Sequence, residues 1–501
     1  MESKYMTLFL VGFVIYAAIL VFAGWYVSKG KSDGKNYLTG GGQMSMFLIF
    51  STMSATLIGT GSSIGATANG FKFGWAGAIY GIGGAIGIFI LAWLAKKGNV
   101  REKNFETMSE EAQYYYGGKA IIRNVMGIMM FLIEIVWLGN HMNGGATYLS
   151  YVTGLDPLYA KIIALLAFAI YVYIGGYLAV VWTDVIQLFI LLIGFAAIVA
   201  TAVPAAGGWT AINTAFTEAG KGGYLSFYGL ESYGVMPALS LAWAILIPAF
   251  GTPTYRMRIY TSKSSKTAAK ALNLSGIILL AFSFIPAIIG MAAFTIATNG
   301  NATAVIERPD FAFAYMATTV LGPVLGLMFM IAGLSATLSS GDSDAIAGVS
   351  ILLQDVYPIF TKKEIPEDKI KQYSRGALLA TLFLAFIATL FAKDVISYMS
   401  NVGGSFVPGV AVAMVLGACW KRANWQGGLA SIFGGTIFGV LYLSVPAVNA
   451  WIAGVFSGPA IPATLVAIVL CVLVSLVTPE DTTSDEERMQ LVIKQRGASE
   501  K

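Results

Sequence analysis

Charged residues are scarce in this chain. Only 11% of its 501 residues are Asp, Glu, Lys or Arg, whereas 57% are hydrophobic. Soluble proteins average about 25% charged residues, so this deficit excludes an ordinary soluble domain and predicts an all-α integral membrane protein. The net charge of +5 lies mostly in the loops between apolar runs, where it indicates topology and not binding to nucleic acid.

Cysteine and histidine are almost absent. Cys419 and Cys471 both fall in apolar runs, and we expect them to pack and not to form a disulfide or a metal pair. His141 is the only histidine. These residues provide neither a metal cluster nor a nucleophile–base pair, so we do not expect an enzyme. We also expect no cleavable signal peptide, because the first apolar run, 7–27, is too long for one.

Long apolar runs are abundant instead. Thirteen of them are long enough to cross about 30 Å of hydrocarbon. They are 7–27, 46–69, 75–95, 121–151, 159–178, 183–204, 235–255, 271–297, 313–342, 375–393, 396–419, 425–446 and 455–477.

Basic residues cluster after the first, third, seventh, ninth and eleventh apolar runs, all on one side of a thirteen-pass count. The clusters are Lys29, Lys31 and Lys35; Lys96, Lys97, Arg101 and Lys103; Arg256, Arg258, Lys263 and Lys266; Lys362, Lys363, Lys369 and Lys371; and Lys421 and Arg422. Loops 205–234 and 298–312, on the other side, contain few Lys or Arg residues. The positive-inside rule therefore predicts an outer N-terminus and a cytoplasmic C-terminus in the cytoplasmic membrane, with the tail after Pro479 solvated and forming at most a short surface helix.

Two apolar runs contain helix breakers at their centres. The second has Gly59 and Gly61 among hydroxyl residues, and the seventh has 248–253, Pro-Ala-Phe-Gly-Thr-Pro. Matching interruptions five helices apart favour an inverted repeat whose freed backbone groups bind ions and solute. The alternative is a pair of kinks that serve packing alone.

Several motifs occur in the order and spacing of one transporter family. They lie at 37–42, 175–187 (with Trp-Thr-Asp), 255–264, 336–357 and 420–424. Together they resemble the sodium/solute symporter family over about residues 35–430. The resemblance implies a leucine-transporter-type fold, with two inverted five-helix repeats, one added helix before them and two after. The corresponding units are 1–35, 36–204, 235–419 and 420–478, followed by a charged cytoplasmic tail, 479–501.

The resemblance also implies a Na⁺ site between the second and ninth apolar runs. Its ligands are the carbonyls of Ala55 and Ile58, the carbonyl of Ala336, and the hydroxyls of Ser339 and Ser340. Residues 336, 339 and 340 share a helix face, as such a site requires. The alternative for the two serines is hydrogen bonding within their own helix.

A second site for a cation or a proton is implied near the first. Asp184 of the Trp-Thr-Asp motif is expected to approach Asp342, with Ser343 beside it. Two neighbouring carboxylates share a proton or hold a cation. The alternative is that both are hydrated in a cytoplasmic vestibule. Asp344 lies about 200° around the helix from Asp342, so the two cannot serve one site directly.

Glu134, Trp137 and His141 form one stripe of a helix, and Glu134 is costly in a membrane unless it is paired. His141 is expected nearer the outer end, in a structural hydrogen bond. Including positions implied by the resemblance, the expected solute-binding residues are Gly59, Ser62, Glu134, Trp137, Asn140, Trp243, Thr252, Ser405 and Phe406.

The acids at membrane depth are Glu134, Asp184, Asp342 and Asp344, and the sequence shows no Lys or Arg at comparable depth. An anionic solute usually requires an arginine. We therefore expect a sodium-coupled symporter for a cationic or zwitterionic amine, with a neutral solute such as a sugar as the alternative. A channel or a sensor on the same fold is the alternative from another class, but the polar residues gather at mid-membrane and the tail is too short for a signalling domain.

Overall fold

The computed structural model describes residues 3–29, 36–173, 176–390 and 395–497. Lys31, Lys35 and Gly175, which belong to the predicted basic loop and motif, lie outside these ranges, as do residues 391–393 of the tenth predicted run. The described part is entirely helical and contains no strand.

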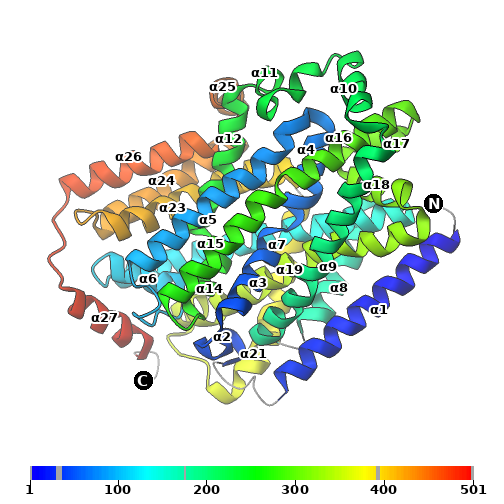
Figure 1. The fold of residues 1–501 in the computed structure, drawn as a ribbon. Helices are drawn as coiled ribbons and strands as arrows, with labels where there is room; N and C mark the ends of the chain where they lie inside the picture. The colour runs from blue at the N-terminus through cyan, green and yellow to red at the C-terminus, as the bar shows by residue number, and fades with distance from the viewer. Residues whose placement is uncertain (1–2, 30–35, 174–175, 391–394, 498–501) are drawn as a thin grey trace.

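The helices of the N-terminal part are shown in Figure 1. They are α1 (Ser3–Ser28), α2 (Asn36–Thr39), α3 (Met46–Leu57), α4 (Ala66–Phe73), α5 (Ile79–Lys97), α6 (Met108–Tyr115), α7 (Ala120–Thr153), α8 (Pro157–Val172) and α9 (Gly176–Ala205).

The remaining helices alternate between long spans and short connecting pieces. They are α10 (Gly208–Glu218), α11 (Leu230–Tyr233), α12 (Val235–Leu246), α13 (Pro248–Gly251), α14 (Pro253–Tyr260), α15 (Ser265–Phe282), α16 (Phe284–Asn299), α17 (Thr303–Glu307), α18 (Ala312–Val320), α19 (Pro323–Ile351), α20 (Tyr357–Thr361), α21 (Ile370–Thr389), α22 (Val395–Tyr398), α23 (Gly404–Cys419), α24 (Trp425–Ser444), α25 (Pro446–Phe456), α26 (Ala460–Val477) and α27 (Asp485–Gly497).

Nine spans of the described residues are long and apolar enough to cross a membrane, or ten if the bent pair Val235–Gly251 and Pro253–Tyr260 is one span. Each of the thirteen predicted runs has a helical counterpart, but the predicted count is not established. The fifth run, for example, forms only the 16-residue helix α8.

Several predicted boundaries were wrong. The sixth run was expected to begin at 183, but α9 begins at Gly176, so Asp184 lies two turns inside the helix and is fully buried. The ninth run was expected to be one segment, 313–342. It is divided at Gly322, whose φ of 75° ends α18 before Pro323 begins α19, and α19 continues to Ile351.

Both predicted interruptions are present. Helix α3 ends at Leu57, and Ile58 leaves the helical conformation with φ −88° and ψ 60° before a π-helical turn at Gly61–Gly65 leads into α4. Thr252 is extended between α13 and α14, with φ −97° and ψ 116°, and the chain bends there by 43°. These breaks leave main-chain polar groups without helical partners at the centre of the bundle.

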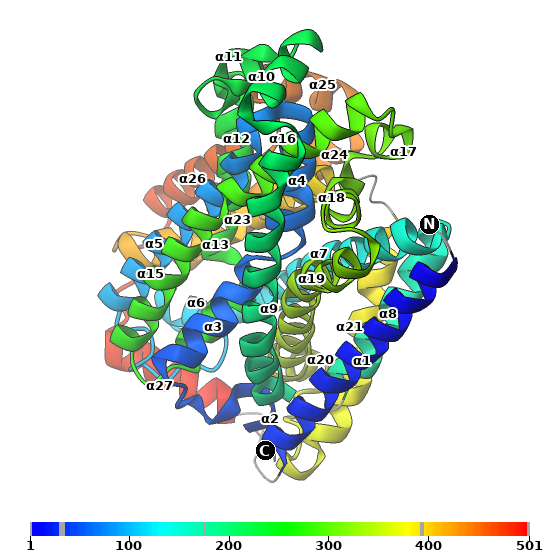
Figure 2. The same cartoon turned by 45° about the vertical axis from the view of Figure 1, so that its right-hand side comes forward.

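Helix α19 packs against both α7 and α9, and α3 packs against both α9 and α15. Helix α1 lies at the outside (Figure 2). Its Val14 and Phe22 side chains are more than 60% exposed, as expected for a surface that meets lipid.

The two ends of the bundle differ. Helices α10, α11 and α17, from the loops predicted to be outside, gather at one end, and α2, α6 and α27, from the predicted cytoplasmic side, gather at the other (Figure 1). The tail after Pro479 contains the short surface helix that the sequence allowed, α27, and this helix is docked on the bundle, because Val492 is fully buried and Arg496 contacts Glu110 of α6.

Candidate functional site

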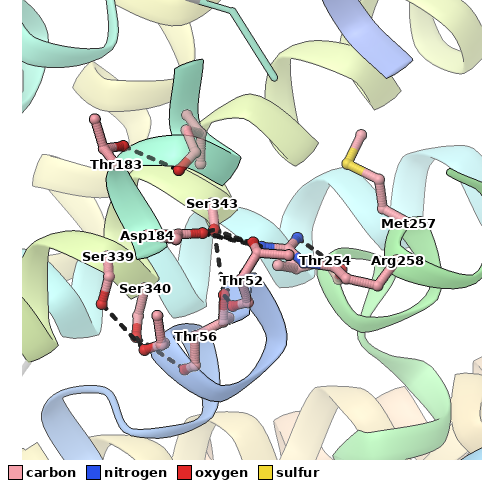
Figure 3. A network of polar contacts seen from close by, with 12 residues as sticks. Thr52, Thr56, Thr183, Asp184, Thr254, Met257, Arg258, Ser339, Ser340 and Ser343 are labelled. Carbon is pink, nitrogen blue, oxygen red and sulfur yellow. Dashed lines mark hydrogen bonds and ion pairs between the residues drawn. The ribbon is translucent and has the colours of Figure 1, made fainter. Parts of the chain in front are cut away.

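Helices α3 and α19 place five oxygen atoms together beside the first break. Ser339 Oγ donates to the Ala55 carbonyl over 3.0 Å, and Ser340 Oγ donates to the Thr56 carbonyl over 2.8 Å. Both hydroxyls also lie near the Ala336 carbonyl, at 3.3 and 3.2 Å. We call these five groups the oxygen cage. Figure 3 shows both serines directed at the turn of α3.

Four of the five predicted sodium ligands, Ala55, Ala336, Ser339 and Ser340, lie in the oxygen cage. Ile58, the fifth, is the residue at which α3 ends. The cage residues are buried, and all their oxygens are neutral. Carbonyl and hydroxyl oxygens are the donors that a hard cation such as Na⁺ prefers, so the residues present fit this ion. The Thr56 carbonyl was not predicted.

Gly59 permits this close approach. A Cβ at position 59 would collide with Ser340 Oγ and with the His141 ring. Gly59 therefore lets α3, α7 and α19 meet at one point.

A second polar network lies beside the cage (Figure 3). Arg258 Nη2 donates to Ser343 Oγ at 2.6 Å, to Thr52 Oγ1 at 2.9 Å and to Thr56 Oγ1 at 3.0 Å. It also lies 3.8 Å from Asp184 Oδ2, which accepts hydrogen bonds from Thr52 and Ser343. The network joins α3, α9, α14 and α19 through one guanidinium.

The inference that no arginine lies at the depth of the acids was therefore wrong. Arg258 is fully buried, although the sequence indicated a basic loop after the seventh apolar run. The break at Thr252 was predicted, but its consequence was not: the bent span carries the residues after it, among them Arg258, back into the bundle.

The expected second cation site also has a different composition. Asp184 and Ser343 lie in one network, but Arg258 already brings a positive charge to it. Asp342 is buried on α19 next to Ser343 in sequence. A buried guanidinium compensates a buried carboxylate without an added ion, so this conformation does not require a second sodium at this point.

A central cavity lies between the two broken segments. Its volume is about 30 Å³, which is room for about two water molecules. A solute larger than water requires the walls to separate. The cavity is lined by Thr56, Leu57, Gly59, Gly61, Ser62, Tyr80, Trp137, His141, Thr252, Tyr255, Asp344 and Met399.

Four of the predicted solute-binding residues, Gly59, Ser62, Trp137 and Thr252, line this cavity. Trp137 Nε1 and Thr252 Oγ1 are buried and make no hydrogen bond in the described part of the chain. Asn140 is also buried and lacks such a partner, but it is not part of the lining. The two lining groups are thus available to a solute.

Three other predicted residues face elsewhere. Trp243 Nε1 donates to Thr464 of α26 over 3.1 Å, so it packs between α12 and α26. Ser405 donates to the Asn401 carbonyl and lies against Gly439 of α24. Phe406 is half-buried on α23 and is not among the lining residues of the described cavity. Their helical faces were misjudged because α12 and α23 turn toward the C-terminal helices.

His141 and Asp344 are more central than the sequence suggested. His141 Nε2 lies 3.3 Å from Asp344 Oδ2, and His141 Nδ1 lies 2.9 Å from Thr60 Oγ1. Both residues line the cavity, so the expected position of His141 nearer the outer end was wrong, whereas the expected hydrogen bond is present in its contact with Thr60. Glu134 lies behind them and accepts a hydrogen bond from the main-chain N–H of Thr254, whose hydroxyl oxygen lies 2.8 Å from Glu134 Oε1. The cavity therefore has a carboxylate in its wall.

The sequence is similar to that of known transporters. The sequence model described as "Sodium:solute symporter family" matches residues 37–435. The chain is 25% identical to a sodium/pantothenate symporter of Haemophilus influenzae, covering 84% of this chain and 86% of that protein. It is 23% identical to a sodium/glucose cotransporter of Vibrio parahaemolyticus, and this match covers 87% of this chain and 84% of that protein.

Solved structures share the fold. A Na⁺-coupled sialic acid symporter in a substrate-bound outward-open state superposes with a TM-score of 0.73 at 18% identity, covering 94% of this chain and 98% of that one. MhsT in complex with L-phenylalanine superposes with a TM-score of 0.54 at 17% identity, with 87% and 98% covered.

Proposed function

Because the chain belongs to the sodium:solute symporter family, and is thus a sodium-coupled transporter, we propose that Na⁺ binds in the oxygen cage and drives the uptake of a small amine-bearing solute. The observation that supports this site most directly is the pair of hydroxyls of α19 on the carbonyls of α3. Ala55, Ala336, Ser339 and Ser340 are the proposed ligands, with Ile58 contributing as the break rearranges.

The cage offers a physical route to coupling. Sodium there links α19 to the end of α3, and the following residues, Gly59, Gly61 and Ser62, line the cavity. An ion that orders this break raises the affinity for solute, and the solute raises the affinity for the ion by the same factor. Because the cavity is small, we propose alternating access, in which the walls separate toward one side of the membrane at a time.

The proposed substrate class follows from the charge of the cavity wall. Asp344 lines the cavity, and aromatic faces are available from Trp137, Tyr80 and Tyr255. A carboxylate beside aromatic rings suits a protonated amine. Arg258, the buried arginine nearby, is engaged with Thr52, Thr56 and Ser343 and is not part of the lining. An anionic solute would thus meet a carboxylate without a free guanidinium.

A neutral polyhydroxylated solute is the second candidate. It is favoured by the relatives, one of which is named as a glucose cotransporter. Asp344 would then accept hydrogen bonds from solute hydroxyls, and His141 would donate a hydrogen bond to one of them.

We further propose the inverted five-plus-five repeat, thirteen crossings in a bilayer, and an outer N-terminus. The two interruptions five predicted helices apart support the repeat. The separation of the two groups of loops to opposite ends supports a consistent sidedness (Figure 1).

A thermal-shift screen of the purified protein tests the proposal. Amines, amino acids and sugars are added one at a time, first in Na⁺ and then in K⁺. An amine that raises the melting temperature only in Na⁺, and fails to do so in Asp344→Asn, supports the proposed substrate class. A sugar that stabilises wild type and Asp344→Asn equally would overturn that class and leave the sodium site intact.

A further inference from the structure

One hydroxyl group lies between two buried carboxyl groups. Thr254 Oγ1 is 2.8 Å from both Glu134 Oε1 and Glu134 Oε2, and 2.9 Å from Asp344 Oδ1. The Thr254 main-chain N–H also donates to Glu134 Oε1, over 2.9 Å. Thr254 follows the break of α14 directly, so the bend places it between α7 and α19.

The number of hydrogens in this arrangement is informative. A threonine hydroxyl has one hydrogen to donate and can otherwise only accept. It cannot serve Glu134 and Asp344 at the same time if both are ionised. One carboxyl group must therefore bring a hydrogen of its own and donate it to Thr254 Oγ1.

Glu134 is the better holder of that hydrogen. It is fully buried and forms no ion pair in the described ranges, whereas Asp344 lies 3.3 Å from His141 Nε2 and borders the cavity. A buried carboxylate without a countercharge costs several kcal/mol, and protonation removes this cost.

If Glu134 is protonated, each of these hydrogen bonds has one donor and one acceptor. Glu134 Oε2–H donates to Thr254 Oγ1, and the Thr254 hydroxyl donates to Asp344 Oδ1. The Thr254 N–H donates to Glu134 Oε1, and His141 Nε2–H donates to Asp344 Oδ2. With both carboxyl groups ionised, at least one of these short oxygen–oxygen contacts would have no hydrogen between its atoms.

The other charged and titratable groups around Glu134 fit this assignment. They are Asp344 from α19, Tyr255 and Arg258 from α14, and His141 from α7. The guanidinium of Arg258 lies 3.8 Å from Asp184 Oδ2 through Nη2, and its Nη1 donates to the Thr254 carbonyl over 2.9 Å. With Glu134 protonated, Asp344, which lies 3.3 Å from His141 Nε2, remains the carboxylate that borders the cavity.

We propose that Glu134 is a proton-binding site, which holds a proton in this conformation and is linked to the cavity through Thr254 and Asp344. When the proton leaves, the Glu134 O–H bond breaks, the proton passes to water, and the Thr254 hydroxyl turns from Asp344 to Glu134. Asp344 then loses a hydrogen bond and gains a negative neighbour. This site is separate from the oxygen cage, and its test does not depend on the identity of the solute.

Infrared spectroscopy of the purified protein in Na⁺ tests the proposal, because the C=O stretch of a carboxylic acid lies apart from that of a carboxylate. We expect a buried-acid band at neutral pH in wild type that is lost in Glu134→Gln and that converts to a carboxylate band at alkaline pH. An acid band of equal size in wild type and Glu134→Gln would overturn the proposal. If the acid band disappears in Asp344→Asn but remains in Glu134→Gln, the assignment of the proton to Glu134 would be overturned.

Glu134→Gln should preserve the fold, because the glutamine amide donates to Thr254 Oγ1 as the acid does. Glu218→Gln is the matched control, since Glu218 is exposed at the end of α10 and its loss should leave the acid band unchanged. If Glu134→Gln does not fold, Thr254→Val serves instead. Removal of the accepting hydroxyl should shift the acid band, and an unshifted band would contradict the proposed contact.

Discussion

Ser339 and Ser340 act through single hydroxyl oxygens on the carbonyls of another helix. Replacement of either by Ala removes one of the proposed sodium ligands while leaving the helix intact. We expect the sodium dissociation constant to rise at least about tenfold, which corresponds to about 1.4 kcal/mol. Isothermal titration with NaCl measures this change.

Ser431→Ala is the matched control for the serine variants. Its buried hydroxyl donates to the Gly409 carbonyl over 2.9 Å in another part of the bundle, so it makes the same kind of contact away from the cage. Equal sodium affinity in wild type, Ser339→Ala and Ser340→Ala would exclude the ligand role.

Arg258 offers a test of buried charge compensation. Arg258→Met should leave Asp184 buried beside Thr52 and Ser343 without its positive neighbour, at a cost of roughly 3–5 kcal/mol. Asp184→Asn added to Arg258→Met should recover much of the loss. Melting temperatures of the two single variants and the double variant measure the coupling, and strictly additive losses would contradict it.

The positions of the motif residues were easier to predict than the question of which helical faces line the cavity. Ser339, Ser340 and Ala336 share a face at i, i+3 and i+4, so their meeting with α3 required only the two helices to be neighbours. Trp243 and Ser405 were misplaced because a helical sequence shows which residues share a face but not which helix that face meets. Arg258 was missed for the same reason, since its depth depends on the bend at Thr252.

At the level of elements, the interruptions were predictable because Gly and Pro act locally. The Gly59–Gly61 cluster and the Pro248–Pro253 run each produce a break where the sequence suggested. Helix ends within continuous apolar sequence were not predictable. Helix α9 begins a full turn or more before its expected start, since hydropathy does not distinguish a turn from a helix.

Helix α27 is held to the end of the bundle by specific contacts. Arg496 Nε donates to Glu110 Oε1 over 2.9 Å, and Gln113 Nε2 donates to Gln495 Oε1 over 2.8 Å. Glu110 in turn pairs with Arg123 of α7 at 3.2 Å. Arg496→Ala should therefore loosen both α27 and α6, seen as at least severalfold faster amide hydrogen exchange in these two helices.

Lys494→Ala provides the control on the same helix, because Lys494 is exposed. It should leave the exchange of α6 unchanged. Equal exchange in the Arg496 and Lys494 variants would mean that the docking of α27 depends on its apolar face alone.

For the whole molecule, a ligand that binds only the folded state adds to stability. Sodium at about 100 times its dissociation constant should contribute about 2.7 kcal/mol. We expect NaCl, but not KCl or choline chloride at equal ionic strength, to raise the melting temperature of the purified protein. The rise should disappear in Ser339→Ala, and an equal rise in KCl would point to a nonspecific salt effect.

The family and the all-helical architecture were predictable from the whole chain, since the motifs at 37–42 and 420–424 lie inside the matched range 37–435. The number of crossings was not, because length and hydropathy alone do not decide whether a 16-residue helix such as α8 spans the bilayer.

The oxygen cage joins residues that are 284 positions apart in the chain. During synthesis, the carbonyls of α3 enter the bilayer long before the ribosome has made the serines that will meet them. No N-terminal fragment that stops short of α19 can therefore assemble the cage. Two separately synthesised halves, divided in the 205–234 connection, would recover it only by finding each other in the membrane.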